Sequence, residues 1–499
     1  MAHRKPEALV LALDIGSSST RSALFDERAR VVTASEARRE YGVRYSADGG
    51  AELSPLELRQ AARFCLAKTL RAQRSSRLSK IPIVGLGGSA FWHSLLGLDK
   101  NSQPLTPVYT WADSRCARDA MELREQFDER EIHAQTGCML RASFWPAKLR
   151  WLRRADRRLF RKVARWVSPA EWIFEEVFGA SGSSHSMASA TGLYDLRTAI
   201  WHSALCEACE VELKKLGALA GVSLRSTTPL QGMGEATVFS AIGDGAAGNL
   251  GSGADGGGRI AINVGTSAAV RLMEDERTRI RPTPFGLFRY AVDDQRMVVG
   301  GAVSNAGNLR RWCARELRIE EAEENVLDRE NAANDALTVL PFWVSERAPT
   351  WPEDLQGTIV GLTQSTDAAQ IFRATTCAVF YRLAEILRRM EKASGRAKQI
   401  IVSGGILKSP ASLRLLADAL GRDICVSPEA EASLRGAAVY VLEKLGYAAA
   451  ALPKGKLVRH NRALAKRHRV RQARQIALEK RLTPRLPKRF RFHRADSGS

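Results

Sequence analysis

The feature that most constrains the fold is a glycine-containing turn that the chain builds twice. Residues 11–26 read LALDIGSSSTRSALFD, with a Gly-Ser turn between two apolar runs, and residues 260–274, IAINVGTSAAVRLME, repeat this layout. The apolar residues beside each turn alternate with a period of two, which predicts a β-hairpin. The acid is not repeated, because Asn263 stands where Asp14 stood. Two related folding units are therefore expected.

The length and the cysteines set the class of protein. A chain of 499 residues is long enough to bury two large cores. It holds no run of about 18 uncharged apolar residues, so no membrane span is expected. Its first residues lack the apolar core of a signal peptide, and its eight cysteines are scattered rather than dense. These features predict a cytoplasmic protein with reduced thiols.

Strand and helix patterns alternate in both halves. Short buried strands are predicted at 81–87 and 399–405, and helices at 53–74 and 367–393. A further helical period, with its arginines on a solvated face, covers 149–167. Alternation of this kind is typical of α/β domains.

A stretch rich in glycine and small residues, 227–259, separates the halves. We therefore expect one α/β domain over residues 1–242, a second over 243–450, and a basic tail over 451–499. The second domain repeats the architecture of the first with little sequence identity between the two.

The net charge of +21 is concentrated in the tail. Residues 453–499 contain 16 Lys or Arg and two acids, a net charge of +14, which leaves +7 for the rest of the chain. Residues 462–482 have a helical period, but the stripe formed by Val470, Ala473 and Ala477 is too thin to bury much surface. We expect a flexible tail with weak, non-specific contact to polyanions such as nucleic acids. A solvated appendage without a function is the alternative.

The two turns suggest a polyphosphate site. Such turns point backbone N–H groups and hydroxyls into one concavity, which suits phosphate oxygens. Two turns that face each other across a cleft would hold a triphosphate, and Asp14 would hold Mg²⁺, which takes one or two carboxylates plus phosphate oxygens. Plain hairpin turns are the alternative. The residues expected to meet the nucleotide phosphates are Gly16, Ser17, Ser18, Ser19, Gly265 and Thr266.

Four further segments make the pattern recognisable. They are SFWPAKLRWL at 143–152, SHSMASATGLYDLRTAIW at 184–201, GTIVGLTQSTDAAQIFRAT at 357–375 and SGGILKSP at 403–410. Together with the turns, they resemble the FGGY carbohydrate kinases, over roughly residues 8–447. The segment at 357–375 is similar to the family's second signature. It departs from the pattern at Thr376 and Cys377, where an apolar residue and then an acid or amide are usual. The resemblance implies two actin/hexokinase-like, ribonuclease H-like domains with a catalytic cleft between them, and ATP and Mg²⁺ as cofactors.

The resemblance also implies a catalytic base. In FSAIGDGAAGNLGSG, at 239–253, Asp244 stands between two glycines. It matches the family's acid that accepts the proton of the sugar hydroxyl, and it would also contact the substrate. The chemistry agrees, because phosphoryl transfer to an alcohol needs a positioned carboxylate. A linker turn or a helix N-cap is the alternative for an Asp-Gly pair.

Two segments of the first domain look like the family's polyol-binding segments, GLGGSAFWHSLLGLD at 85–99 and TWADSRC at 110–116. A polyol needs directed donors and acceptors and one flat apolar wall. Arg115 would also suit a carboxylate, through bidentate contact, although Asp113 and Arg115 could instead pair with each other. His93 and Trp111 could serve structure alone. The expected substrate contacts are Ser89, His93, Trp111, Asp113 and Arg115.

The nucleotide is expected on the second domain. Gly404 and Gly405, between a strand and a helix, would let adenine approach the backbone, and Asn305 is a plausible polar contact or else a capping residue. The sequences of several segments are most similar to those of the gluconokinase branch, so gluconate is the expected acceptor. Xylulose, ribulose and glycerol are the alternatives. A non-catalytic actin-like sensor of sugar or nucleotide is the alternative of another class. The resemblance also allows a homodimer.

Overall fold

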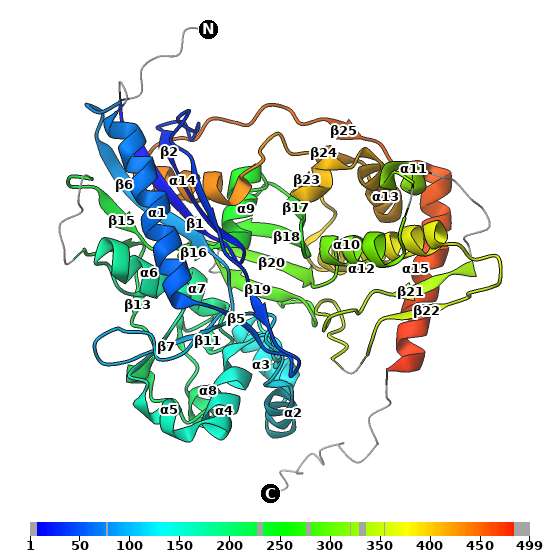
Figure 1. The fold of residues 1–499 in the computed structure, drawn as a ribbon, viewed down its shortest axis with the longest axis horizontal. Coiled ribbons are helices and arrows are strands. Elements are labelled where there is room, and N and C mark those ends of the chain that lie inside the picture. Colours follow the sequence, from blue (N-terminus) through cyan, green and yellow to red (C-terminus); the bar gives the residue numbers. More distant parts are fainter. Residues whose placement is uncertain are drawn as a thin grey trace, which may run out of the picture.

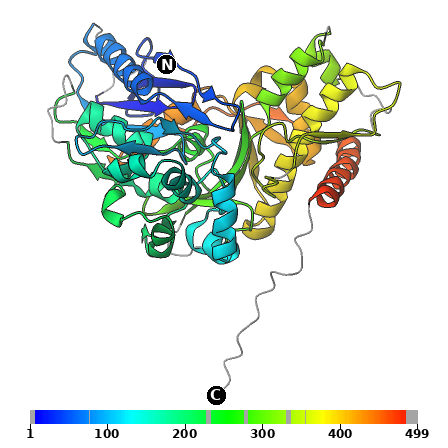
Figure 2. The same ribbon diagram turned by 60° about the horizontal axis from the view of Figure 1, so that its bottom comes forward.

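In the computed structural model the chain forms two lobes, each built on a seven-stranded sheet (Figures 1 and 2). The hairpins predicted around the two turns lie at the centre of these sheets. Within the part of the chain that the structure describes, no helix is both long and apolar enough to cross a membrane. The described residues are 7–75, 78–226, 233–275, 281–319, 321–328, 336–353 and 355–483.

The first sheet has the strand order β14-β15-β6-β1-β2-β3, and β16 also pairs with β6. The hairpin strands β1 and β2 are antiparallel, whereas β1 and β6 are parallel. The strands of this sheet are β1 (Leu9–Ile15), β2 (Ser19–Asp26), β3 (Ala37–Glu40), β6 (Ile83–Ala90), β14 (Ser223–Leu224), β15 (Thr237–Phe239) and β16 (Ile242–Gly243).

Helices and small sheets surround the first sheet. The helix predicted at 53–74 is α1, which packs on β2 and β3. The helices are α1 (Pro55–Arg74), α2 (Ala117–Gln126), α3 (Glu129–Thr136), α4 (Trp145–Ala155), α5 (Arg157–Lys162), α6 (Pro169–Phe178), α7 (His185–Ser189) and α8 (Ser203–Ala208). The small strands are β4 (Arg44–Tyr45), β5 (Ala51–Leu53), β7 (Leu96–Leu98), β8 (Val108–Tyr109), β9 (Arg165–Val167), β10 (Ser183–Ser184), β11 (Tyr194–Asp195), β12 (Ile200–Trp201) and β13 (Leu219–Ala220).

The expectation of one helix over 149–167 is wrong. Asp156 ends α4 and caps α5, because its side chain accepts a hydrogen bond from the Leu159 N–H. After α5, residues Arg165–Val167 form the strand β9. The helical period of this segment therefore continues across a break at Asp156, and aspartate is a residue type that favours helix caps.

The second sheet has the order β19-β20-β18-β17-β23-β24-β25. Its strands are β17 (Arg259–Val264), β18 (Ala268–Asp275), β19 (Phe288–Ala291), β20 (Arg296–Val303), β23 (Gln399–Ser403), β24 (Ile424–Val426) and β25 (Leu457–Val458), beside the separate pair β21 (Thr338–Leu340) and β22 (Thr358–Val360). The helices of this half are α9 (Asp244–Ser252), α10 (Gly307–Glu316), α11 (Glu323–Asp328), α12 (Ala368–Ser394), α13 (Pro410–Leu420), α14 (Ala432–Lys444) and α15 (Arg462–Leu482).

The two sheets share one plan, as the repeated turn predicted. In each, the first hairpin strand pairs in parallel with a strand that follows a long helix. The register sets Asp14 opposite Ser89 in the first sheet and Asn263 opposite Ser403 in the second. Both pairs are hydrogen-bonded: the Ser89 hydroxyl donates to Asp14, and the Asn263 amide donates to the Ser403 hydroxyl at 3.1 Å. The acid and the amide thus occupy equivalent places.

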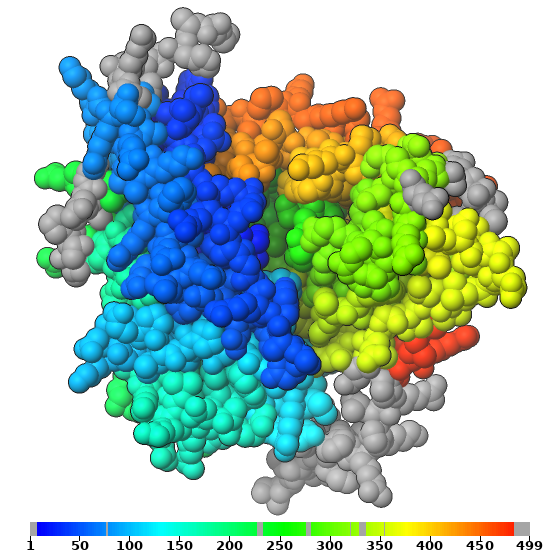
Figure 3. Space-filling view, viewed as in Figure 1, coloured from blue at the N-terminus to red at the C-terminus, as the bar shows by residue number. Residues whose placement is uncertain are grey.

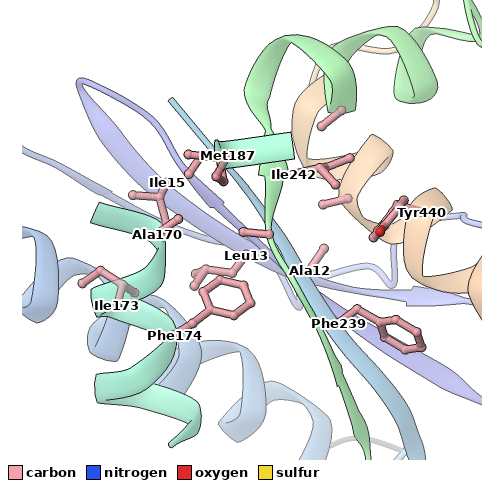
Figure 4. Packing of buried hydrophobic residues seen from close by; sticks show 14 of the residues in the cluster. Ala12, Leu13, Ile15, Ala170, Ile173, Phe174, Met187, Phe239, Ile242 and Tyr440 are labelled. Carbon is pink, nitrogen blue, oxygen red and sulfur yellow. The ribbon is translucent and has the colours of Figure 1, made fainter. Parts of the chain in front are cut away.

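Helix α14 returns to the first lobe, although it comes late in the sequence. Residues such as Ala438, Tyr440 and Val441 belong to the same core cluster as the buried residues of β1 and β6. Figure 4 shows Tyr440 near Phe239 and Ala12 within this cluster. In Figure 1, α14 lies beside α9 and the first sheet. The first core is therefore completed by a segment from the far end of the chain.

Helices α9 and α14 cross with their backbones in contact. A Cβ added at Gly251 would lie 1.7 Å from the Ala432 carbonyl oxygen, and one added at Gly436 would lie 1.7 Å from the Ala247 carbonyl oxygen. No side chain fits at either position. This contact fixes α9, and with it the position of Asp244, the first residue of that helix.

The basic tail is partly docked. The helix expected over 462–482 is formed by α15, but it packs against α12, α13 and β21 instead of remaining mobile (Figure 1). Polar side chains, rather than an apolar stripe, hold α15 against the second lobe. Its buried face is made by His468, Gln475 and Glu479, whereas Val470, on the expected apolar stripe, is 52% exposed. The remainder of the tail, 484–499, lies outside the described residues.

Each polar residue on the buried face of α15 has a specific partner. Glu479 forms a buried ion pair with Arg382 at 2.6 Å. The Gln475 side-chain amide donates to the Val339 carbonyl at 2.8 Å, and His468 Nδ1 lies 2.8 Å from the Tyr381 hydroxyl. Removing one member of a buried ion pair costs about 3–5 kcal/mol. The helix is therefore an integral part of the second lobe.

The contact between α9 and α14 predicts opposite effects for two glycines of one helix. We expect Gly251→Ala to lower the free energy of unfolding by about 3 kcal/mol or more, because the added methyl overlaps a backbone carbonyl. Gly248→Ala is the matched control. Its Cβ would meet only the Ser433 hydroxyl at 3.6 Å, so it should stabilise the protein by about 0.5–1 kcal/mol. Thermal unfolding measures both; equal melting temperatures for the two variants would contradict the contact.

Candidate active site

A cavity of about 120 Å³ lies between the two lobes. We call it the interdomain cavity. Figure 3 shows the surface hollowed between the blue N-terminal half and the green-to-yellow C-terminal half. The cavity is lined by Ser17, Phe91, Trp92, His93, Trp111, Ser143, Asp244, Asn263, Ser267, Ala268, Ala269, Arg271, Phe288, Tyr290, Ala302, Arg347 and Trp351.

Aromatic rings form much of its wall. Phe288 and Tyr290, neighbours on one face of β19, stack with ring centroids 4.5 Å apart. Trp92 packs edge-on against Tyr290 at 5.0 Å, and its indole N–H donates to the Ser186 carbonyl at 3.1 Å. Flat apolar walls with a few directed polar groups are typical of small-molecule sites.

Asp244 lies at the junction of three elements. It follows the short strand β16, which pairs with β6, and it is the first residue of α9. The Gly243 N–H donates to the Ser186 hydroxyl at 3.1 Å, and a Cβ at Gly243 would overlap the ring of Trp92. The glycines on either side let the backbone approach these neighbours, which holds the carboxylate at the cavity wall.

Burial raises the pKa of Asp244 to about 6. The positive charge of Arg271 opposes this rise, the negative charge of Asp14 adds to it, and the Gly245 N–H and Arg347 lower it. A carboxylate with a pKa near 6 is ionised at neutral pH, yet it is basic enough to accept a proton. The site therefore holds a candidate general base.

His93 is held as a neutral acceptor. Burial lowers its pKa to about 3, and its Nδ1 lies 2.6 Å from the Ala190 carbonyl oxygen. The Nδ1 therefore carries the proton, and Nε2 can only accept a hydrogen bond. Its backbone has φ +67°, in the left-handed region that non-glycine residues rarely adopt. Strain of this kind is common at functional sites.

Asp14 is buried behind the first turn. Its carboxylate accepts from the Ser89 hydroxyl and pairs with Arg21 at 3.4 Å. Arg21 also pairs with Glu431, just before α14. Burial raises the pKa of Asp14, while Arg21 and Ser89 oppose the rise. Within the described residues no group of three or more His, Cys, Asp or Glu is arranged to enclose a metal ion.

A second cavity, of about 430 Å³, opens on the C-terminal lobe. Its walls come from the second turn, the N-terminal half of α10, one face of α12 and the residues after β23. Gly265 and Thr266 line it, as does Gly405. The residues that line it are Val264, Gly265, Thr266, Ala306, Gly307, Leu309, Arg310, Arg311, Glu324, Thr375, Thr376, Val379, Phe380, Gly405, Ile406, Lys408, Ser409 and Ser412.

The second turn is braced by the start of α10. The Gly307 N–H donates to the Gly265 carbonyl at 3.0 Å, and the Asn308 N–H donates to the Thr266 carbonyl at 3.1 Å. Gly404 has φ +91°, and a Cβ there would lie 2.7 Å from the Val264 carbonyl oxygen. The glycine is therefore required by close backbone packing at the cavity edge.

Several predicted site residues do line these cavities. The interdomain cavity contains Ser17, His93, Trp111 and Asp244, and the second cavity contains Gly265, Thr266 and Gly405. The rest of the first turn has varied surroundings. The Gly16 N–H donates to the Ser19 carbonyl at 3.0 Å, Ser18 is exposed, and the buried Ser19 hydroxyl has no hydrogen-bond partner among the described residues.

Three predicted substrate contacts do not line the interdomain cavity. Ser89 is fully buried and donates to Asp14. Asp113 and Arg115 pair with each other, which was the alternative left open by the sequence, and Arg115 also pairs with Glu52 at 2.6 Å. The Arg115 guanidinium lies over the Trp151 ring at 4.5 Å. These charges are satisfied within the first lobe, so Arg115 is not placed to bind a carboxylate in the cavity.

Asn305, expected as a nucleotide contact or a capping residue, has a different role in the structure. It is fully buried, and its amide donates to the Val344 carbonyl at 3.0 Å and to Glu346 at 3.1 Å. Its side-chain oxygen accepts from the Val344 N–H at 3.0 Å. The side chain is therefore used to hold the segment before Arg347, and it does not line the second cavity.

Sequence reasoning missed the charged and aromatic residues that the second lobe contributes, among them Arg271, Tyr290, Arg347 and Trp351. Only Arg271 carried a signal, as a charged residue inside an apolar strand beside the second turn. The loop with Arg347 and Trp351 has no periodic pattern, and its approach to the first lobe depends on tertiary packing.

Comparisons with known proteins agree with this architecture of two lobes around a cleft. The N-terminal domain model of the FGGY family of carbohydrate kinases matches residues 9–251, and the C-terminal domain model matches residues 260–442. The chain belongs to the FGGY family of carbohydrate kinases. It is thus a phosphotransferase with an alcohol group as acceptor, and a kinase of this family implies ATP as a substrate.

Individual relatives are similar over most of the chain. The gluconokinase of Bacillus subtilis is 29% identical, with 88% of each chain covered. A glycerol kinase of Paraburkholderia phytofirmans is 26% identical over 88% of this chain and 90% of its own. The crystal structure of gluconate kinase from Lactobacillus acidophilus has the same fold, with a TM-score of 0.85, 22% identity and coverage of 95% and 98%.

The raised pKa of Asp244 predicts a cost in stability. The folded state holds its proton up to about pH 6, whereas the unfolded chain releases it near 3.8. Stability contributed by this group is therefore present at low pH and lost as pH rises from about 4 to 6, by about 3 kcal/mol in total. We expect Asp244→Asn to raise the melting temperature at pH 7.5 and to leave it almost unchanged near pH 4.

The control for this prediction is Asp128→Asn, at the exposed N-cap of α3, where asparagine caps equally well. It should not change the melting temperature at either pH. A lower melting temperature for Asp244→Asn than for the unmodified protein at pH 7.5 would contradict the account.

Proposed function

We propose that this kinase transfers the γ-phosphoryl group of ATP to a hydroxyl of gluconate, with Asp244 as the general base. The observation that carries the proposal is the position of this buried carboxylate, with a pKa near 6, in the wall of a cavity between the lobes. The second cavity begins at the second turn, whose neighbouring residues Asn263 and Ser267 also line the first cavity. An acceptor and a nucleotide would therefore meet there.

The nucleotide would occupy the second cavity. Its volume of about 430 Å³ suits an adenosine group. Residues Gly404 and Gly405 allow close approach to the backbone, and Lys408 supplies positive charge. The triphosphate would extend toward the interdomain cavity between the two turns, where N–H groups and hydroxyls suit phosphate oxygens.

The transfer step then needs few protein groups. The acceptor oxygen attacks the γ-phosphorus while its proton passes to the Asp244 carboxylate. The new O–P bond forms as the bond to the β-phosphate oxygen breaks, and ADP leaves. The aromatic walls around Trp92 and Tyr290 exclude water, which would otherwise compete as the acceptor.

The residues present fit Mg²⁺, which takes one or two carboxylates with phosphate oxygens and waters. Asp14 would hold it, because its carboxylate lies at the end of β1 beside the first turn and interacts electrostatically with Asp244. When bound, the ion would offset the negative charge of the phosphates. Asn263 at the equivalent place in the second lobe adds no further negative charge.

Gluconate is favoured by the gluconokinases among the relatives and by the positive charge of Arg271 and Arg347 in the interdomain cavity. Xylulose, ribulose and glycerol are the alternative acceptors, since glycerol kinases and a xylulose kinase are also among the relatives.

An assay of ADP release over a panel of acceptors tests the proposal. We expect ATP-dependent turnover to be greatest with gluconate, compared with xylulose, ribulose and glycerol. Asp244→Asn should lower kcat by about 10²-fold or more, because an amide cannot accept the proton, while ATP binding by calorimetry stays unchanged. Preference for a neutral acceptor would make the acceptor assignment wrong. Absence of turnover with every acceptor would favour a sensor.

A further inference from the structure

Two guanidinium groups in the interdomain cavity lack a carboxylate partner among the residues that the structure describes. Among the described residues, the side chain of Arg271 makes no hydrogen bond or ion pair, and its Nε is buried without a partner. Arg347 donates from Nε to the Ser304 hydroxyl at 3.1 Å and from Nη2 to the Val303 carbonyl at 3.3 Å, and its Cζ lies 4.3 Å from the centre of the Trp111 ring. It too forms no ion pair with a described residue.

Several other arginines with buried or half-buried side chains are paired with carboxylates. Arg289 pairs with Glu274, Arg382 with Glu479 at 2.6 Å, and Arg296 with Asp293 at 2.8 Å. A buried charge is costly unless it is paired and hydrogen-bonded. The Arg271 guanidinium, which has neither an ion pair nor a hydrogen bond to a described residue, bears this cost without a partner. Such an arrangement is expected where a ligand supplies the missing partner.

The fold makes room for Arg271 at this place. A Cβ added at Gly245 would lie 2.5 Å from its Nε and 2.7 Å from its Cζ. The guanidinium is thus seated against the backbone at the start of α9, next to Asp244. Burial lowers the pKa of Arg271, and the charge of Asp244 opposes this. With His93 neutral, Arg271 and Arg347 outweigh Asp244, so the charged groups lining the cavity favour an anion.

The position of Arg271 along its strand distinguishes between two anions that it could bind, the transferred phosphoryl group and a carboxylate of the acceptor. The second turn ends where β18 begins at Ala268, and Arg271 is three residues further on. Three residues of strand span about 10 Å. The transferred phosphoryl group would lie near the turns, so Arg271 is placed for a carboxylate of the acceptor rather than for the phosphoryl group.

We propose that Arg271 is the residue that selects an anionic acceptor, by pairing its guanidinium with the carboxylate of a sugar acid. Arg347, held over Trp111, adds positive charge to the same cavity. The inference rests on the proposed function, because it requires an acceptor with a carboxylate. Arg271 thus takes the carboxylate-binding role that the sequence suggested for Arg115, which pairs within the first lobe.

The test compares Arg271→Leu and Arg271→Lys with the unmodified enzyme, using gluconate and D-glucitol, a neutral acceptor of the same chain length. Assays are run at pH 8.5, because loss of Arg271 would raise the pKa of Asp244 and the base must be ionised in every variant. For Arg271→Leu, we expect KM for gluconate to rise about 10- to 100-fold, as for loss of a charge-assisted pair, with kcat changed less than about 3-fold. Turnover of D-glucitol should not fall.

For Arg271→Lys, KM for gluconate should lie between the values for the unmodified enzyme and for Arg271→Leu, because lysine keeps the charge and loses the bidentate geometry. Arg259→Leu is the matched control: this arginine begins the neighbouring strand and pairs with Asp255 at 2.6 Å outside the cavity, so KM for gluconate should not change. Melting temperatures and ATP binding report whether each variant is folded; if Arg271→Leu is not, Arg271→Lys decides.

The outcomes separate the two proposals. If the unmodified enzyme does not phosphorylate gluconate, the proposed function fails and the inference fails with it. If it does, and Arg271→Leu lowers kcat for both acceptors with KM unchanged, Arg271 serves the phosphoryl group and the inference alone is overturned. An unchanged KM and kcat for gluconate would overturn it as well.

Discussion

The close crossing of α9 and α14 is the contact on which the rest of the site depends. Gly251 and Gly436 allow the two backbones to touch, since neither position has room for a Cβ. Through this contact a helix from the end of the chain completes the first core and fixes the helix that begins with Asp244. The residue before α14, Glu431, pairs with Arg21, which also contacts Asp14. The crossing therefore positions Asp244 directly, and it places Glu431 beside Arg21, the partner of Asp14.

The cleft concentrates charge where burial makes charge costly. Burial raises the pKa of Asp244, and Arg271 and Arg347 lie in the same cavity without a carboxylate partner in the described part of the chain. In contrast, Asp113 and Arg115, which looked like substrate contacts, neutralise each other in the first lobe. Pairing separates the structural charges of this protein from those left for substrates. A protein that needs a basic carboxylate and an anion site accepts this cost at the site and offsets it with packing elsewhere.

The fold could be predicted from the sequence further than the site could. Local signals sufficed for the hairpins around the two turns and for α1 and α12, because strand and helix periods and capping residues act over a few positions. They failed at Asp156, where a helix cap interrupts a helical period, and on α15, whose buried face is polar. Asp244 was predicted as the base from the family resemblance of the small-residue stretch around it. Arg347 was not, because Asn305 and Glu346 position its segment through tertiary contacts.

The central claim is that one cleft between the lobes brings acceptor, base and nucleotide together. A crystal structure of the protein with gluconate, Mg²⁺ and a non-hydrolysable ATP analogue tests it most directly. The account predicts a gluconate hydroxyl within about 3 Å of the Asp244 carboxylate, with adenosine in the second cavity and phosphates between the two turns. Gluconate bound with no hydroxyl near Asp244, or a nucleotide bound outside the second cavity, would contradict it.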